Sequence, residues 1–182
     1  MRNLTKPYPT YEDCQYLWEY YQTPPHVIRH CQAVSRTAVL IAERLNEHGY
    51  RFNLELLAVS GWLHDMMRLE EDHGACAARE LRKLGYDDVA DVVRVHMRYH
   101  LDPEREALDE TDLLCFADRL VKEDHFVGLD DRMEYIIEKS RQYNDPEAEP
   151  RIRRSFQMTK ELQKKIEATI GVRLEDIDHM LD

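Results

Sequence analysis

The chain has 182 residues, of which 43% are hydrophobic and 34% are charged, and its formal net charge is −11 at pH 7. This length and composition are typical of one globular domain and exclude a disordered chain. The acidic charge argues against a nucleic-acid polymer as a partner, because proteins that bind nucleic acids concentrate positive charge.

The sequence predicts a mostly helical fold, because glycine is scarce, with 6 residues, and β-branched runs are rare. After an extended lead-in at residues 1–10, we expect a first helix at 11–22. The stretch TPPH then supplies Thr23 as N-cap for a second helix, from Pro25 to His48. The apolar face of this helix has regular helical spacing: Val27, Cys31, Val34, Ala38, Ile41 and Leu45.

A third predicted helix, from Asn53 to Met67, is apolar on nearly every side, and we expect it to be the most buried one. Three further helices are expected at 72–84, 87–99 and 112–124, followed by three more charged ones at 129–144, 146–171 and 173–181. We divide the chain into a lead-in with one helix at 1–23, a core at 24–125 and a helical extension packed on that core at 126–182.

The compartment is predicted from the cysteines and from the start of the chain. The four cysteines form no CxxC pair and lie in apolar helical patterns, which favours a reduced, cytoplasmic setting. The first residues, MRNLTKPYPTYEDC, contain no apolar segment, so we expect no signal peptide. No apolar run is long enough to suggest that the chain spans a membrane.

Six polar residues interrupt apolar helix faces where a core is expected: His30, His64, Asp65, His73, His96 and Asp118. One such histidine alone is usually a hydrogen-bonded core residue, and one such aspartate is usually a cap or half of an ion pair. Six of them would each need a buried partner, whereas a shared metal site satisfies all of them. Imidazoles and carboxylates on facing helices suit Fe, Mn, Zn or Ni.

In their order along the chain, these residues resemble the H…HD…H…H…D signature of the HD-domain metal-dependent phosphohydrolases. The resemblance covers residues 24–125 and rests on the motifs VIRHCQAV, LHDMMR, DHGACAARELRKLGY, VVRVHMRYH and FADRLV. It implies an all-α HD-domain bundle that holds two divalent transition metal ions. The implied ligands of the first ion are His30, His64, Asp65 and Asp118. Those of the second ion are Asp65, as a bridge, with His73 and His96.

The resemblance also implies a phosphomonoesterase or phosphodiesterase that hydrolyses a small phosphate ester or anhydride, with a nucleotide as the first candidate. Metal-activated hydroxide would attack phosphorus, and the predicted catalytic residues are Asp65 and Arg68. The family often has lysine at the position of Arg68. Arginine keeps the charge and can bind a phosphate through two hydrogen bonds, but it cannot act as a general acid.

Four residues are candidates for substrate binding: Arg68, Arg119, His26 and His100. The two histidines each lie four residues from an implied ligand and so share its helix face. For these histidines and for Arg119, a solvated surface position is the alternative interpretation.

The same ligand set leaves other functions open. Some proteins that share it resemble mixed-valent di-iron oxygenases. Alternatively, a non-catalytic binding or regulatory module would keep the metal only to stabilise its fold. A mononuclear nucleotidase would leave His73 and His96 idle. The sequence names neither the substrate nor the metal, and it leaves a homo-oligomer open.

Overall fold

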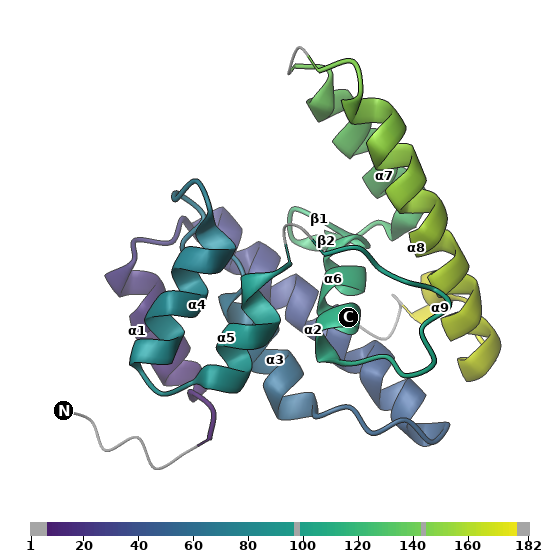
Figure 1. Ribbon diagram of the computed structural model, residues 1–182. Coiled ribbons are helices and arrows are strands. Elements are labelled where there is room, and N and C mark those ends of the chain that lie inside the picture. Colours follow the sequence, from purple (N-terminus) through teal and green to yellow (C-terminus); the bar gives the residue numbers. More distant parts are fainter. Residues whose placement is uncertain (1–6, 97–98, 143–144, 178–182) are drawn as a thin grey trace.

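The structure is a computed structural model that describes residues 7–96, 99–142 and 145–177 (Figure 1). Its elements are α1 (Tyr11–Tyr20), α2 (Pro25–Glu47), α3 (Leu54–Leu63), α4 (His73–Lys83), α5 (Asp87–Arg94), α6 (Glu110–Asp118), β1 (Val121–Lys122), β2 (His125–Phe126), α7 (Gly128–Ser140), α8 (Ala148–Ile170) and α9 (Leu174–Ile177). The predicted all-α class is confirmed, since the strands form only one short antiparallel pair. No helix in these ranges is both long enough and apolar enough to cross a membrane.

Two clusters of buried apolar side chains form the core, and α3 contributes to both. Leu57 of α3 packs in one cluster with α2, α6 and α8. Val59 and Leu63 pack in the other with α1, α4 and α5. This apolar helix is therefore central, but the prediction that it is the most buried one is wrong, because six of the nine residues of α6 are buried against five of the ten in α3. Phe156 and Leu162 place α8 in the first cluster, while the division of the chain near residues 23 and 125 stays a prediction.

Helices α2 and α3 pack at close range because Gly61 has no side chain. A Cβ at Gly61 would lie 2.6 Å from Cα of Ser35. The Ser35 hydroxyl donates to the Ala58 carbonyl at 2.9 Å, which fixes the crossing further. This approach brings His30 of α2 beside His64, whose ring centroid lies 5.5 Å from that of His30.

The prediction that α3 continues to Met67 is wrong, because three of its last carbonyls accept side-chain donors instead of helical N–H groups. The His64 ring donates to Gly61 O at 2.8 Å, the Trp18 indole to Trp62 O at 3.0 Å, and Thr23 Oγ1 to Met66 O at 2.6 Å. Turns follow from residue 64 to residue 69. The predicted N-cap role of Thr23 is also wrong. Its hydroxyl bonds to the Met66 carbonyl, and the N-cap of α2 is Pro24, which makes no side-chain cap.

Two other predicted helices also end early. Helix α6 ends at Asp118 rather than Asp124, because Glu123 has a φ of 55°, which no α-helix accommodates, and the chain turns there between β1 and β2. Helix α5 ends at Arg94 rather than Tyr99, and the His96 ring donates to Val93 O at 2.7 Å. Residues 97 and 98 of that predicted helix lie outside the described ranges.

A buried ion pair holds the loop before α6. Asp112 is 1% exposed, and it accepts from Arg105 Nη1 at 2.7 Å and from the Tyr99 hydroxyl at 2.7 Å. Asp112 also accepts from the backbone N–H of Asp109 at 2.9 Å and so closes the cap of α6. Burial raises the pKa of Asp112 despite these partners, so its charged form depends on the cation.

We predict that Gly61→Ala destabilises the protein by about 1–3 kcal/mol, because the added Cβ forces the backbones of α2 and α3 apart. Urea unfolding followed by circular dichroism measures this loss. The control Ala168→Ser adds one atom to an exposed helical position and should stay within about 0.5 kcal/mol of the wild type. Equal stability of the two variants would contradict the close crossing.

We predict that Arg105→Met costs about 2 kcal/mol of stability at pH 7, because it leaves the Asp112 carboxylate buried without its cation. A group whose folded pKa is raised stabilises the fold less as the pH rises, so the difference from the wild type should shrink as the pH falls through the folded pKa of Asp112. Denaturant unfolding at several pH values measures it. The control is Arg173→Met, whose ion pair with Asp176 is exposed.

Candidate metal centre

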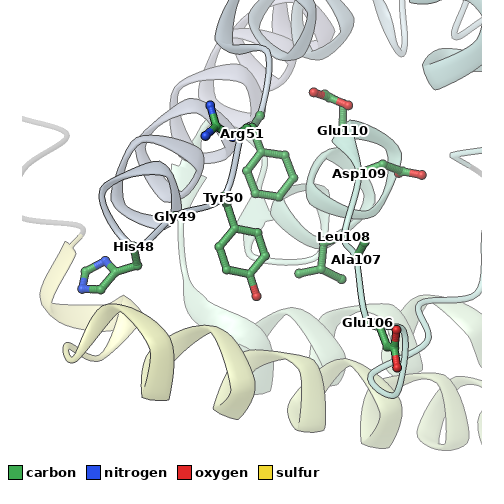
Figure 2. A pocket seen from close by; sticks show the side chains of 10 residues that line it. His48, Gly49, Tyr50, Arg51, Glu106, Ala107, Leu108, Asp109 and Glu110 are labelled. Atoms are coloured by element: carbon green, nitrogen blue, oxygen red, sulfur yellow. The ribbon is translucent and has the colours of Figure 1, made fainter.

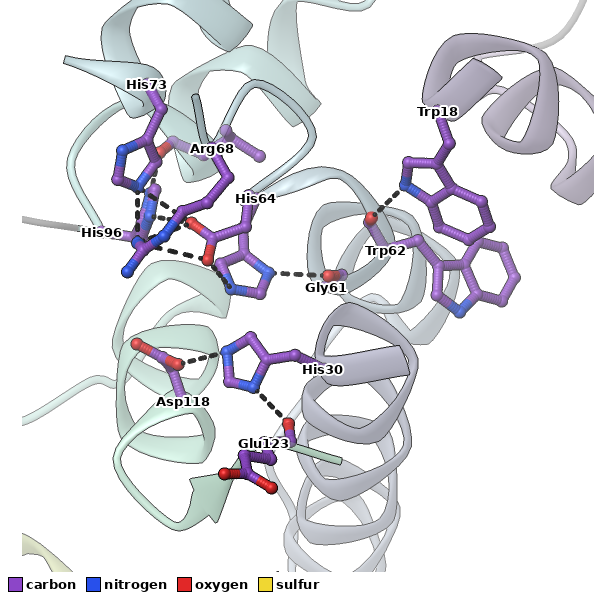
Figure 3. Close-up of polar contacts among 12 residues, drawn as sticks. Trp18, His30, Gly61, Trp62, His64, Arg68, His73, His96, Asp118 and Glu123 are labelled. Atoms are coloured by element: carbon purple, nitrogen blue, oxygen red, sulfur yellow. Dashed lines mark hydrogen bonds and ion pairs between the residues drawn. The ribbon is translucent and has the colours of Figure 1, made fainter. Parts of the chain in front are cut away.

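The six polar residues that interrupt the apolar faces come together in the structure (Figure 3). His30 lies on α2, His73 begins α4 and Asp118 ends α6. His64 caps the end of α3, and Asp65 and His96 follow the ends of α3 and α5, so the early ends of these two helices shape the centre. Four of the six side chains belong to residues that are almost fully buried: His64, Asp65, His73 and His96.

Asp65 is the hub of one half of the centre. Its Oδ1 lies 2.9 Å from His73 Nε2 and 3.2 Å from His96 Nε2, and its Oδ2 lies 3.9 Å from His64 Nε2. Gly74 permits this packing, because a Cβ there would lie 3.2 Å from the His96 ring. One carboxylate therefore faces three imidazoles.

The other half of the centre is held by the β1–β2 hairpin. His30 Nε2 lies 3.0 Å from Asp118 Oδ1, while His30 Nδ1 donates to the carbonyl of Glu123 at 2.7 Å (Figure 3). The left-handed conformation of Glu123 belongs to the turn that presents this carbonyl. Arg29 donates to Asp124 at 3.0 Å and ties the same turn to α2. Nothing in the sequence singles out Glu123, because its backbone carbonyl has no residue signature.

The hydrogen bonds of three rings determine which nitrogen faces the centre. A carbonyl can only accept, so His30, His64 and His96 each carry a proton on Nδ1. Their neutral forms then present the Nε2 lone pair to the carboxylates, which also cannot donate when ionised. Facing lone pairs repel one another unless a proton or a metal ion lies between them.

The pKa values show that the centre attracts positive charge. Burial opposes ionisation of Asp65, yet His64, His73 and His96 hold its pKa well below its usual range. Burial likewise opposes protonation of His30 and His96, but the hydrogen bonds to Asp118 and Asp65 outweigh it and raise both pKa values. Burial lowers the pKa of His64 to about 4, which keeps that ring neutral at pH 7.

The residues present fit metal ions. His64 Nε2 is buried and has no hydrogen-bond partner, which is costly for a polar atom but suits a metal ligand. Two groups have one ligand atom from each residue within 4.8 Å of the others: His30, His64 and Asp65; and Asp65, His73 and His96. Asp118 contacts the first group through His30. The backbone carbonyls behind three rings fix their orientation, as is usual for histidine ligands.

Arg68 lies at the edge of the second group. Its Nη1 is 3.2 Å from His73 Nε2 and 3.4 Å from Asp65 Oδ2, and the ionised carboxylate accepts from it. The guanidinium thus supplies positive charge beside this carboxylate. The side chain is 46% exposed, so it can swing towards the cavity that it lines.

The other candidates for substrate binding are placed differently. His26 is exposed and lines the same cavity as His30 and Arg68. Arg119 is not among the lining residues, since its guanidinium donates to Thr159 Oγ1 of α8 and to the Tyr99 carbonyl, both at 2.8 Å. Arg119 therefore joins α6 to α8. This placement agrees neither with the predicted substrate contact nor with the alternative of a solvated surface position. His100 is exposed and does not line the cavity either.

The cavity at the centre has a volume of about 420 Å³. Helix α7 supplies its outer wall through Arg132, Tyr135, Ile136 and Lys139. No motif in the sequence connects these four residues with the site. A separate hollow of about 450 Å³ lies at the C-terminal end of α2, beside the stacked rings of Tyr50 and Phe52 (Figure 2). None of the six clustered residues lines that hollow.

Comparison with known proteins identifies the family. The model of the HD domain matches residues 27–123, more than half of the chain, so the protein belongs to the HD-domain family, as the motifs indicated. A curated relative, an uncharacterized protein of Methanocaldococcus jannaschii, is 38% identical over 66 residues. That match covers 35% of this chain and 39% of the relative. No solved structure matches the chain.

We predict that Asp65→Asn abolishes tight metal binding, because Asp65 belongs to both groups of ligands, whereas His73→Ala leaves the first group intact and lowers the metal content by half. Elemental analysis of purified protein measures the content, and circular dichroism checks the fold. Asp91→Asn, which changes an exposed carboxylate paired with Arg82, is the control. Full metal content in Asp65→Asn would rule out this ligand set.

Proposed function

We propose that the protein is a metal-dependent phosphohydrolase that acts on a small phosphate ester or anhydride, with a nucleotide as the first candidate substrate. The observation that carries this proposal is the group of Nε2 lone pairs and carboxylate oxygens that face one another below a cavity with cationic walls. Fe, Mn, Zn or Ni ions bound there would lower the pKa of water enough to supply hydroxide at neutral pH.

In this proposal the two carboxylates and the backbone carbonyls of the centre have separate roles. Asp65 and Asp118 remain ionised, because nearby histidines hold their pKa values well below the usual range. The backbone carbonyls of Gly61, Val93 and Glu123 keep three rings in the orientation that presents Nε2. Neither task requires movement of the backbone, so the centre is preorganised.

Arg68 is the proposed phosphate contact. Its exposed guanidinium lies at the boundary between the ligands and the cavity, and it can bind two oxygens of a phosphoryl group as charge develops. Arginine stays protonated at neutral pH, so the proton for the leaving group comes from elsewhere. His26 lines the same cavity and is a second proposed contact.

We also propose a reducing, cytoplasmic setting and no nucleic-acid polymer as partner. Cys14, Cys31 and Cys115 are buried free thiols, and the formal net charge of −11 disfavours a long phosphate backbone.

We predict that the metal-loaded protein hydrolyses phosphoesters and that Arg68→Met lowers kcat/KM about 100-fold, because a phosphate contact is lost. Arg68→Lys should lose less, since it keeps the charge but not the paired hydrogen bonds. Turnover of p-nitrophenyl phosphate, bis(p-nitrophenyl) phosphate and a nucleotide panel measures this. Arg79→Met, at an exposed arginine paired with Glu80, is the matched control.

Two results would contradict the proposal. Full turnover after removal of the metal would show that the centre is not catalytic. A mixed-valent iron pair that consumes oxygen without hydrolysing any phosphoester would support the oxygenase alternative instead.

A further inference from the structure

Helix α7 presents one face to the cavity of the metal centre. Arg132, Tyr135, Ile136 and Lys139 follow the spacing i, i+3, i+4 and i+7 of a single helical side, and all four line the cavity. The helix lies outside the stretch that matches the HD-domain model. In Figure 1, α7 starts beside the β1–β2 hairpin and runs outward along α8. This chain therefore adds its own wall to the site of the family.

The wall is strongly cationic and is organised around one aromatic ring. Lys122 of β1 does not itself line the cavity, but its Nζ lies 4.6 Å from the ring centroid of Tyr135, and Lys139 Nζ lies 4.5 Å from that centroid. The guanidinium carbon of Arg132 is 5.5 Å away. Each cation gains from the ring, but three like charges held around it repel one another. An anion between them would relieve that repulsion.

Two of these three cations lack the carboxylate partners that other basic residues have. In the described ranges, no ion pair involves Lys122 or Lys139, whereas Lys160 and Lys164 on α8 pair with Asp130 and Glu161. Arg132 is 3.9 Å from Asp118, and its Nε is buried without a partner. In a chain with a net charge of −11, two lysines without an acidic partner beside the metal centre indicate a place for an external anion.

The spacing along α7 suggests the form of that anion. Arg132 Nη2 lies 3.9 Å from Asp118 of the metal centre, whereas Lys139 lines the same cavity without an ion pair to any of the six clustered residues. A phosphoryl group at the metal centre would therefore meet Arg132 and leave Lys139 for a further phosphoryl group. A chain of two or three linked phosphoryl groups would extend from the centre along this face. The ring of Tyr135 already holds two ammonium groups, so the wall offers charge rather than a free surface for base stacking.

We propose that Lys122, Arg132 and Lys139 around Tyr135 form a second anion subsite, and that the substrate carries two or more linked phosphoryl groups, with or without a nucleoside. This inference rests on the proposed phosphohydrolase site, because it assigns the first phosphoryl group to the metal centre. The subsite then determines which phosphate compounds the protein prefers.

The test compares binding of inorganic tripolyphosphate and orthophosphate to the metal-loaded protein by calorimetry at fixed salt. We expect tripolyphosphate to bind at least tenfold more tightly, and Lys122→Met/Lys139→Met to remove about tenfold of that affinity, because two charge contacts are lost. Orthophosphate binding should stay within twofold. Tripolyphosphate also chelates metal ions, but equally for every variant, so the difference between variants reports on the lysines.

The matched control is Lys160→Met/Lys164→Met, which removes the same charge from α8 outside the cavity and should leave the affinity for tripolyphosphate within twofold of the wild type. ATP is measured alongside, and Lys122→Met/Lys139→Met should bind ATP about tenfold more weakly than the wild type does. Tighter binding of ATP than of tripolyphosphate would indicate a nucleoside-bearing ligand, and equal binding a polyphosphate. Circular dichroism verifies that both variants are folded.

Equal losses in the two double variants would overturn the subsite, because net charge alone would then explain them. A wild-type protein that binds orthophosphate as tightly as tripolyphosphate would also overturn it. Hydrolysis by the wild type is measured separately. A protein that shows the predicted binding pattern but hydrolyses no phosphoester would contradict the proposed function and leave the subsite standing.

Discussion

Acceptor atoms that face one another are the constraint on which this structure depends. Nε2 atoms of buried imidazoles lie about hydrogen-bond distance from carboxylate oxygens, while backbone carbonyls already hold the Nδ1 protons of three rings. Such an arrangement is stable only with positive charge inside it. The raised pKa values of His30 and His96 show that these two rings favour a proton there, and the buried, unpartnered Nε2 of His64 is suited to a metal ion.

The fold holds these atoms in place by ending its helices early. Side chains of His64 and His96 bond to carbonyls three residues before them, so α3 and α5 end where their histidines enter the centre. Gly61 lets α2 approach α3, and the β1–β2 hairpin orients His30 through the carbonyl of Glu123. The positions that break helical regularity are thus the positions that build the centre, a conflict between local and functional demands that is usual at active sites.

Electrostatics connects the centre with the wall that α7 adds to it. Asp65 and Asp118 concentrate negative charge at the bottom of the cavity, while Arg68, Arg132 and Lys139 place positive charge on its sides. Metal ions held by these carboxylates, together with the basic side chains along the wall, would attract the same extended anion. The HD-domain match ends before α7, so this wall is where a common centre would gain a preference of its own.

The sequence by itself determined the helical class, the central position of α3 and the six residues of the centre, because apolar periodicity and buried polar side chains are local signals. It did not determine where α3 ends, since the distant side chains of Trp18 and Thr23 take carbonyls that a longer helix would need. Nor did it determine the ends of α5 and α6, which precede the bond of the His96 ring to Val93 O and the hairpin turn at Glu123. Nor did it separate Arg68, which lines the cavity, from Arg119, which bonds to α8. Both arginines follow an aspartate of the motif within three residues, and only the packing of α7 and α8 decided which one meets the site.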